Sequence, residues 1–250
     1  MKPNEIRICG LAAVRARFER APETFVRLYF DRPTAQRVGA LCTALAAARK
    51  VYRCVEPAEL EKIAESVHHG GIVAVVAEAP ARTPSAADCA GWARRRENLV
   101  VLDRVGNAHN LGAIARTAAY LGVPRLVIAG DATAARAGAA AYRVAEGGLD
   151  AIEVWVAPAT APLVRQLAAA GYDVVGAATR GGSAAAPSAK PWALVMGNEE
   201  HGLAPAVQAA CSRLVTIAGS GRVESLNVSA AAAILLHDLI GAQARAPRKS

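Results

Sequence analysis

The feature that most constrains the fold is a series of apolar runs between residues 98 and 219 without polar alternation. The runs are NLVVLD (98–103), RLVIAG (125–130), IEVWV (152–156), YDVVGAAT (172–179), WALVMG (192–197) and LVTIAG (214–219). Segments with helical spacing separate or follow them, at 110–122, 135–146, 160–170 and 225–240. Strands without alternation are typical of parallel sheets covered by helices on both faces. The sequence therefore predicts an α/β domain over residues 98–245.

A smaller α/β unit is predicted before it, over residues 1–80. Its expected strands are 26–30, 51–55 and 71–78, and its expected helices are 12–19, 35–49 and 57–66. The segment between the two units, 81–97, is rich in Pro, Ala and Arg and has no sustained period. We expect a linker or lid there. Its triplet Arg94–Arg96 is either solvated or in contact with an RNA backbone.

Charge and composition narrow the class of protein. The formal net charge is +8 with a pI near 9.6, which favours a polyanionic partner. Aromatic residues make up 4%, which disfavours binding built on base stacking. The start MKPNEIRICG lacks the apolar region of a signal peptide, and no apolar run reaches the ~20 residues of a membrane span. The five cysteines are scattered without metal-ligand spacing, so we expect a cytoplasmic protein without a metal site.

The common nucleotide-binding loops are missing from the sequence. No G-x-x-x-x-G-K-[ST] run occurs, which excludes a P-loop. Gly219-Ser220-Gly221 begins like a dinucleotide fingerprint, but Glu224 stands at the third glycine position. Gly181-Gly182-Ser183 is not a nucleophile elbow, because residue 185 is Ala. The sequence therefore disfavours a kinase, a dehydrogenase and a serine hydrolase, because the motif of each class is missing.

Polar residues instead gather where strands end, the edge at which parallel sheets bind ligands. The first group is NAHNLGAIARTA, residues 107–118. Asn110 is expected to cap a helix that starts at Leu111. Arg116 is expected to lie over Gly112, because residues four apart share a helix face and side chains tilt toward the N-terminus. Taken alone, the motif fits a capped surface helix with a solvated arginine.

The second and third groups follow later strands. In LVMGNEEHGL (194–203), Gly197 and Gly202 permit close ligand approach around Glu199, whereas His201 fits a surface residue better than a functional one. In IAGSGRVESLNVSAAAAILL (217–236), Ser225 is the expected N-cap of an alanine-rich helix. Capping alone does not explain Asn227 or the two-glycine loop before it.

Together and in this order, the three groups resemble the motifs of a known enzyme family. N-x-G-A-I-x-R at 110–116, G-N-E-x-x-G-L at 197–203 and E-S-L-N-V-S at 224–229 are similar to motifs one to three of the SpoU (TrmH) ribose 2′-O-methyltransferases of the SPOUT superfamily. The likeness covers roughly 98–240. Residues 5–78 more loosely resemble the family's L30e-like substrate-binding domain. Two departures, Asn107-Ala108 for Asp-Pro and Ala218 for Pro, affect loop stiffness rather than reacting groups.

The resemblance implies more than the patterns show. It implies a deep trefoil knot in the C-terminal domain, a homodimer formed through the knot with a shared active site, RNA as the partner, and no metal. It also implies S-adenosylmethionine as the cofactor. The implied cofactor-binding residues are Ala177, Thr179, Gly197, Ile217, Leu226 and Asn227. The implied catalytic or substrate-facing residues are Asn110, Arg116, Glu199, Ser225 and Asn227.

The implied reaction is attack of a ribose 2′-hydroxyl on the methyl group of the cofactor, which requires alignment and removal of a proton. The arginine of motif one is proposed as the base in this family, yet a guanidinium with a pKa above ~12 is a poor base. Arg116 therefore either accepts the proton or grips the phosphate beside the ribose. Glu199 is expected to brace its loop, against Arg116.

Two rival functions remain at this point. One is a retired methyltransferase that binds RNA or assists ribosome assembly, against which the intact motifs count. The other is a methyltransferase of bases or protein side chains, against which ESLNVS counts. The sequence leaves ribosomal and transfer RNA both open as substrates.

Overall fold

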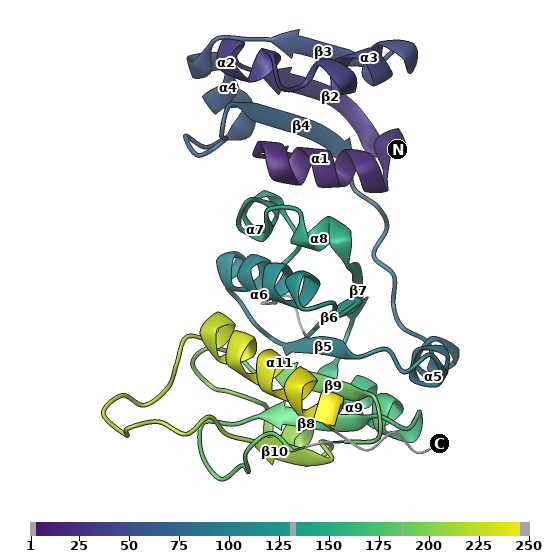
Figure 1. The fold of residues 1–250 in the computed structure, drawn as a ribbon, viewed down its shortest axis with the longest axis vertical. Coiled ribbons are helices and arrows are strands. Elements are labelled where there is room, and N and C mark those ends of the chain that lie inside the picture. Colours follow the sequence, from purple (N-terminus) through teal and green to yellow (C-terminus); the bar gives the residue numbers. More distant parts are fainter. Residues whose placement is uncertain (1–3, 131–133, 187, 246–250) are drawn as a thin grey trace.

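The computed structural model describes residues 4–130, 134–186 and 188–245, which form two α/β units joined by residues 78–98 (Figure 1). The larger unit is built on a six-stranded sheet in which every pair of neighbouring strands is parallel. In spatial order its strands are β10 (Arg213–Val215), β8 (Asp173–Ala177), β9 (Trp192–Met196), β5 (Leu99–Asp103), β6 (Arg125–Ala129) and β7 (Glu153–Ala157). The predicted α/β fold with a parallel sheet is confirmed.

Helices cover both faces of this sheet, which explains its uninterrupted apolar strands. On β5, Val100 and Leu102 face one core, whereas Leu99 and Val101 face the other. The first core is closed by α6 (Ala108–Tyr120), α7 (Ala139–Ala145), α8 (Gly148–Ala151) and α11 (Val228–Arg245). The second is closed by α5 (Ala86–Arg94), α9 (Thr160–Ala169) and α10 (Pro205–Gln208). Alternate side chains of one strand are thus buried in different cores.

The N-terminal unit is a four-stranded mixed sheet in the order β1 (Glu5–Cys9), β4 (Ile72–Ala77), β2 (Phe25–Phe30) and β3 (Val51–Cys54). β4 is antiparallel to both of its neighbours, and β2 is parallel to β3. Its helices are α1 (Leu11–Arg20), the short 3-10 turn η1 (Pro22–Thr24), α2 (Arg32–Ala35), α3 (Gly39–Ala47) and α4 (Pro57–Ala64). β1 lies outside the strands that we expected from the sequence.

The segment predicted as an irregular linker contains a helix. α5 begins with a capping box in which Ser85 and Asp88 bond each other's backbone N–H groups. The spacing S-x-x-D is the sequence signal for such a start, and our reading missed it. Before the helix, the Arg82 carbonyl accepts from the N–H of Val156, and its guanidinium lies 4.0 Å from the centre of the Trp155 ring. The connection therefore passes edge strand β7 and contacts it at Trp155 and Val156.

The two units share one hydrophobic core. α1 of the N-terminal unit packs against α7 and α8, as Figure 1 shows, and buried side chains such as Val14 and Leu149 belong to the same cluster. Within the described ranges, no helix is both long and apolar enough to cross a membrane.

Candidate functional site

A cavity of about 830 Å³ opens at the carboxyl ends of the adjacent strands β10, β8 and β9. Its walls are residues 177–180 after β8, 196–203 after β9 and 217–226 after β10, together with one face of α11. Three consecutive strands each contribute a loop here because parallel strands end at the same edge. A site of this size fits a cofactor or a drug-sized ligand.

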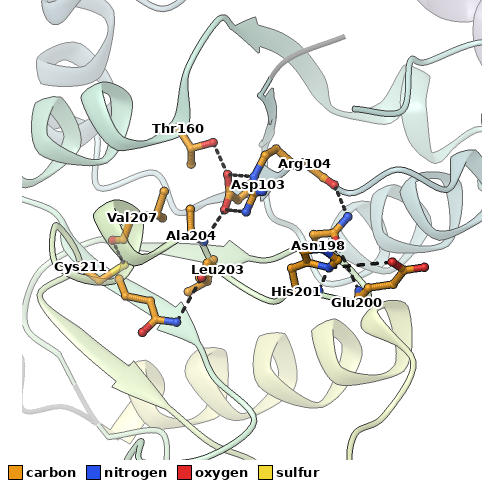
Figure 2. Close-up of polar contacts among 11 residues, drawn as sticks. Asp103, Arg104, Thr160, Asn198, Glu200, His201, Leu203, Ala204, Val207 and Cys211 are labelled. Carbon is orange, nitrogen blue, oxygen red and sulfur yellow. Dashed lines mark hydrogen bonds and ion pairs between the residues drawn. The ribbon is translucent and has the colours of Figure 1, made fainter. Parts of the chain in front are cut away.

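The loop after β9 is a tight turn closed on itself. Asn198 and Gly202 exchange backbone hydrogen bonds of 3.1 and 2.9 Å, and the Asn198 side-chain oxygen accepts from the N–H groups of Glu200 and His201. A Cβ on Gly197 would lie 2.3 Å from the carbonyl carbon of Gly202, so only glycine fits there. The Asn198 amide also donates to the Arg104 carbonyl (Figure 2). The turn is thereby fixed to the end of β5.

A buried carboxylate that the sequence analysis missed holds this edge together. Asp103, 1% exposed, accepts from the Thr160 hydroxyl at 2.5 Å and from the Ala204 N–H at 3.1 Å (Figure 2). Arg104 provides its ion pair, at 3.3 Å. The last residue of β5 thus fixes both the start of α9 and the end of the β9 loop. A charged residue ending an otherwise apolar strand was the available signal.

Glu199 reaches from the β9 loop to the start of α6. Its carboxylate accepts from the backbone N–H groups of Gly106 and Asn107, at 3.1 and 3.2 Å, and from the Asn110 amide at 2.9 Å. Partial burial raises the pKa of Glu199, but these hydrogen bonds outweigh it and leave the pKa below its ordinary value. The predicted bracing role lies in these contacts, since the ion-pair partner of Arg116 is Glu146 and not Glu199.

The two helix caps differ from the prediction. α6 begins at Ala108 and is capped by Asn107, whose side chain accepts from the His109 N–H. Asn110 is therefore inside the helix and 9% exposed, and its side chain does not cap the helix. α11 begins at Val228, and the residue that caps it is Asn227 instead of Ser225: its side chain accepts from the N–H and hydroxyl of Ser229.

These shifts bring the three sequence motifs into one hydrogen-bonded chain. Asn227 donates through its amide to the Asn110 oxygen at 3.1 Å, and Asn110 donates in turn to Glu199. Because a carboxylate only accepts, Glu199 fixes the orientation of the Asn110 amide, and that amide fixes Asn227. One residue from each motif is thus held by a residue of another.

The side chain of Arg116 does not lie over Gly112, where we predicted it. Gly112 is not open space for its side chain, because a Cβ there would lie 2.4 Å from the Ala141 carbonyl oxygen of α7. The Arg116 side chain is 55% exposed and pairs with Glu146, at 2.9 Å between Nη2 and Oε2. α7 occupies the surface over Gly112, so the arginine turns to the residue that follows α7.

The structure gathers most, but not all, of the predicted site residues at the cavity. Those that line it are Ala177, Thr179, Gly197, Glu199, Ile217, Ser225 and Leu226. Asn110, Arg116 and Asn227 are not among its lining residues, although Asn110 and Asn227 join it through Glu199. Among the residues that the structure describes, no cluster of His, Cys, Asp or Glu could hold a metal ion.

A parallel sheet with a large cavity at its carboxyl edge, flanked by polar side chains from three loops, defines an α/β domain with a ligand-binding site, joined here to an N-terminal unit. Comparison with known proteins identifies the family to which the chain belongs. The sequence matches the SpoU rRNA Methylase family over residues 97–237, and residues 7–81 match the domain described as RNA 2′-O ribose methyltransferase substrate binding. The chain belongs to the SpoU family, and it is an RNA methyltransferase.

Similar proteins support this over nearly the whole chain. The chain is 32% identical to the 23S rRNA (guanosine-2′-O-)-methyltransferase RlmB of Bordetella pertussis, over 93% of this chain and 96% of that protein. It is 31% identical to the uncharacterized tRNA/rRNA methyltransferase YfiF of Escherichia coli O157:H7, over 94% and 68%. Among solved structures, an rRNA methyltransferase from Sinorhizobium meliloti matches with a TM-score of 0.76 at 25% identity, over 95% and 87%. The SpoU methyltransferase AviRb from Streptomyces viridochromogenes, in complex with AdoMet, shares the fold with a TM-score of 0.77 at 24% identity, over 97% and 92%.

Proposed function

We propose that this chain methylates a ribose 2′-hydroxyl in ribosomal RNA, with S-adenosylmethionine as the methyl donor. The observation that carries the proposal is a series of two hydrogen bonds, from Asn227 to Asn110 and from Asn110 to Glu199, which joins the three motifs beside the cavity. Similarity to RlmB along nearly its full length favours ribosomal over transfer RNA. An RNA substrate also agrees with the net charge of +8.

The residues around the cavity fit the proposed cofactor. Its volume of about 830 Å³ holds a nucleoside with an amino-acid tail, and Met196, Ile217 and Leu235 offer apolar walls for a purine ring. The exposed glycine loop after β10, which lines the cavity with Gly219 and Ser220, would offer backbone N–H and carbonyl groups to the ligand. Ala177, Thr179, Gly197, Ile217 and Leu226 would hold the cofactor. Bound there, it supplies a methyl group already activated by the sulfonium.

Asn227 does not line the cavity, and it acts on the site through its hydrogen bonds to residues beside it. Its side chain is occupied by Ser229 and Asn110, so it fixes the backbone that carries Leu226. Glu199 likewise acts as a brace: both carboxylate oxygens accept hydrogen bonds, and its lowered pKa makes it a weak base. Ser225 lines the cavity, and we propose that its hydroxyl orients the cofactor or the ribose.

Arg116 is the residue that we assign to the RNA. Its exposed guanidinium suits bidentate contact with the phosphate beside the target ribose, which would hold the 2′-hydroxyl in line. Glu146 is a solvent-exposed partner, 53% accessible, so RNA can reach the same guanidinium. We assign Arg116 to anchoring the substrate rather than to accepting the proton.

We also propose that the enzyme is a cytoplasmic homodimer whose site is completed by a second copy. Two observations support the dimer: Arg116 is outside the cavity lining, and the apolar side chains of Val223 and Ile234, which we do not assign to the cofactor, are exposed at the cavity at 74% and 39%. The division into a substrate-binding domain (1–80), a connection (81–97) and a catalytic domain (98–245) with a deep trefoil knot belongs to the same proposal. The knot is what the family resemblance implies for a domain whose chain passes from edge strand β7 to β8, beyond β6, β5 and β9.

The test is transfer of labelled methyl groups from S-adenosylmethionine to ribosomal RNA, with the product mapped as alkali-resistant linkages. We expect Arg116→Ala to abolish transfer while cofactor affinity, measured by calorimetry, stays near that of the wild type. Arg165→Ala is the matched control, because Arg165 is an exposed arginine of α9 on the other face of the sheet. Near-normal turnover of Arg116→Ala would remove the assignment. Wild-type protein that binds RNA without transferring methyl groups would favour the retired-enzyme alternative.

A further inference from the structure

Arg116 is held by an elbow of the chain, residues 146–148, that connects α7 to α8. Glu146 ends α7 in the left-handed conformation, with φ of 45°, and directs its carboxylate to Arg116. A glutamate pays a steric cost for this backbone, which an asparagine or glycine would largely avoid. The side chain at this strained position is the one that contacts the proposed RNA anchor.

Two glycines follow, and both are needed for close packing. A Cβ on Gly148 would lie 2.7 Å from the Cα of Arg116 itself. A Cβ on Gly147, whose φ is 95°, would lie 2.9 Å from the Cβ of Ala16 in α1. The elbow is therefore packed between α6 of the catalytic domain and α1 of the N-terminal unit, with no room for a side chain on either side.

A buried polar clamp fixes the elbow to the N-terminal unit. Arg17 of α1 donates through Nε to the Asp150 carboxylate of α8 at 2.6 Å, and its Nη2 donates to the Tyr142 hydroxyl of α7. The side chains of Arg17 and Asp150 are 8% and 4% exposed. Burial raises the pKa of Asp150 more than the Arg17 charge lowers it. Such a pair contributes little net stability but strongly favours one geometry, because either partner left alone would be an uncompensated buried charge.

We propose that Glu146 is a positioning residue for Arg116, and that the Arg17–Asp150–Tyr142 clamp fixes the elbow that carries it. Docking of the N-terminal unit then sets the direction of the guanidinium. Glu146 holds Nη2, which leaves the remaining N–H groups of the fork for the RNA. The inference rests on the proposed role of Arg116, and it gives a reason for the packing of α1, in the proposed substrate-binding domain, against α7 and α8.

The principal variant is Glu146→Gln, and the chain offers a close control. Glu65 also ends a helix in the left-handed conformation, with φ of 53°, and pairs with an arginine, Arg7, at 2.8 Å. Glu65→Gln therefore removes the same kind of exposed pair away from Arg116. Tyr142→Phe tests the clamp, because it removes only the hydroxyl that accepts from Arg17 and keeps the ring that Arg17 covers. Asp150→Asn tests it more strongly.

Two readouts separate positioning from mere folding. The first is kinetic: we expect Glu146→Gln to lower kcat about tenfold, with KM for RNA and Kd for S-adenosylmethionine changed less than about twofold. The second needs no activity: the side-chain Nε–H signal of Arg116 in ¹⁵N-arginine-labelled protein, assigned by its loss in Arg116→Ala. We expect it to move toward the signals of solvated arginines in Glu146→Gln, and partly so in Tyr142→Phe and Asp150→Asn. Glu65→Gln should change neither readout.

Several outcomes would overturn the inference. They are an unmoved Arg116 signal in Glu146→Gln, an equal fall in kcat in Glu65→Gln, and a faster Glu146→Gln enzyme, since the carboxylate would then compete with RNA. If Asp150→Asn does not fold, Tyr142→Phe decides whether the clamp reaches Arg116. Failure of the proposed function is distinguishable: it is absence of methyl transfer by the wild type, while the Arg116 signal still reports whether Glu146 positions the side chain.

Discussion

Replacing Gly112 by alanine tests how closely α7 packs against the N-terminal half of α6. The new Cβ would lie 2.4 Å from the Ala141 carbonyl oxygen and 3.0 Å from the Cβ of Val144. To reach ordinary contact of about 3.4 Å, α7 must withdraw by about 1 Å. Because the obstructing atom belongs to the backbone, no rotamer change can relieve the clash. Overpacking of this kind costs about 1–3 kcal/mol.

The helix itself opposes this cost. Because the clash is with backbone, we take the upper half of that range, about 2–3 kcal/mol. Alanine stabilises a helix interior over glycine by about 1 kcal/mol, so the net destabilisation of Gly112→Ala is about 1–2 kcal/mol. For a chain of this size that corresponds to a fall in Tm of about 2–8 °C, measured by thermal unfolding followed by circular dichroism. Because Glu146 follows α7 directly, methyl transfer should fall as well.

The matched control is Gly91→Ala in α5. Gly91 is also a buried helix glycine, but its Cβ would meet only the flexible ends of Arg95 and Arg94, at 3.5 and 3.8 Å. The propensity gain is then unopposed, and Tm should rise by about 1–4 °C. A Gly112→Ala protein as stable as the wild type, or a Gly91→Ala protein that is less stable, would refute the packing argument.

Three further predictions concern the site. Glu199 has a lowered pKa in the fold, so its contribution to stability is full above its unfolded pKa of about 4.3 and is lost as the pH falls through the folded value. The Tm of Glu199→Gln should therefore lie below that of the wild type at pH 7 and approach it in acid. A difference in Tm that stays constant with pH would contradict this. Asp103→Asn replaces an acceptor of hydrogen bonds from Thr160 and Ala204 and should cost about 2–3 kcal/mol in urea unfolding, against about 1 kcal/mol for Thr160→Val; equal costs would place the stabilisation in the Thr160 contact alone. RNA affinity should fall linearly with salt on logarithmic axes, and a slope near zero in filter binding would exclude phosphate contacts as its main source.

The parallel sheet was predictable because a strand buried on both faces needs apolar residues at successive positions, which appear in the sequence as an uninterrupted apolar run. The cavity was predictable in position for a related reason: once the strands are parallel, their carboxyl ends and the polar residues after them share one edge. Gly197 and Ile217 could therefore be placed at this edge from the sequence, whereas their assignment to the cofactor came from the family resemblance. The missed strand β1 does carry a signal, because residues 5–8 alternate between polar and apolar, which is the period of a half-buried strand. α5 has no clear apolar period, and its signal is the capping box at its start.

Individual side-chain roles were less predictable, because several residues in a short stretch satisfy the same local rule. Asn107 and Asn110 are both good N-caps, as are Ser225 and Asn227, and in each pair we chose the wrong residue. The choice is made by distant parts of the chain: Glu199 and Asn227 both bond the Asn110 side chain, whereas the Asn107 side chain accepts from the His109 N–H and caps the helix. Asp103 was missed for the same reason, since its partners Thr160 and Ala204 are 57 and 101 residues away.

Arg116 shows how a correct local rule can give a wrong contact. Helical geometry places residues 112 and 116 on one face, and the absent side chain at Gly112 reads as space for the arginine. The space is instead used by the backbone of α7, whose close approach brings Glu146 beside Arg116. The glycine thus serves the arginine indirectly: it admits the helix that carries the arginine's partner. A small residue in a motif can mark the approach of another element as readily as that of a ligand, and only the fold tells which.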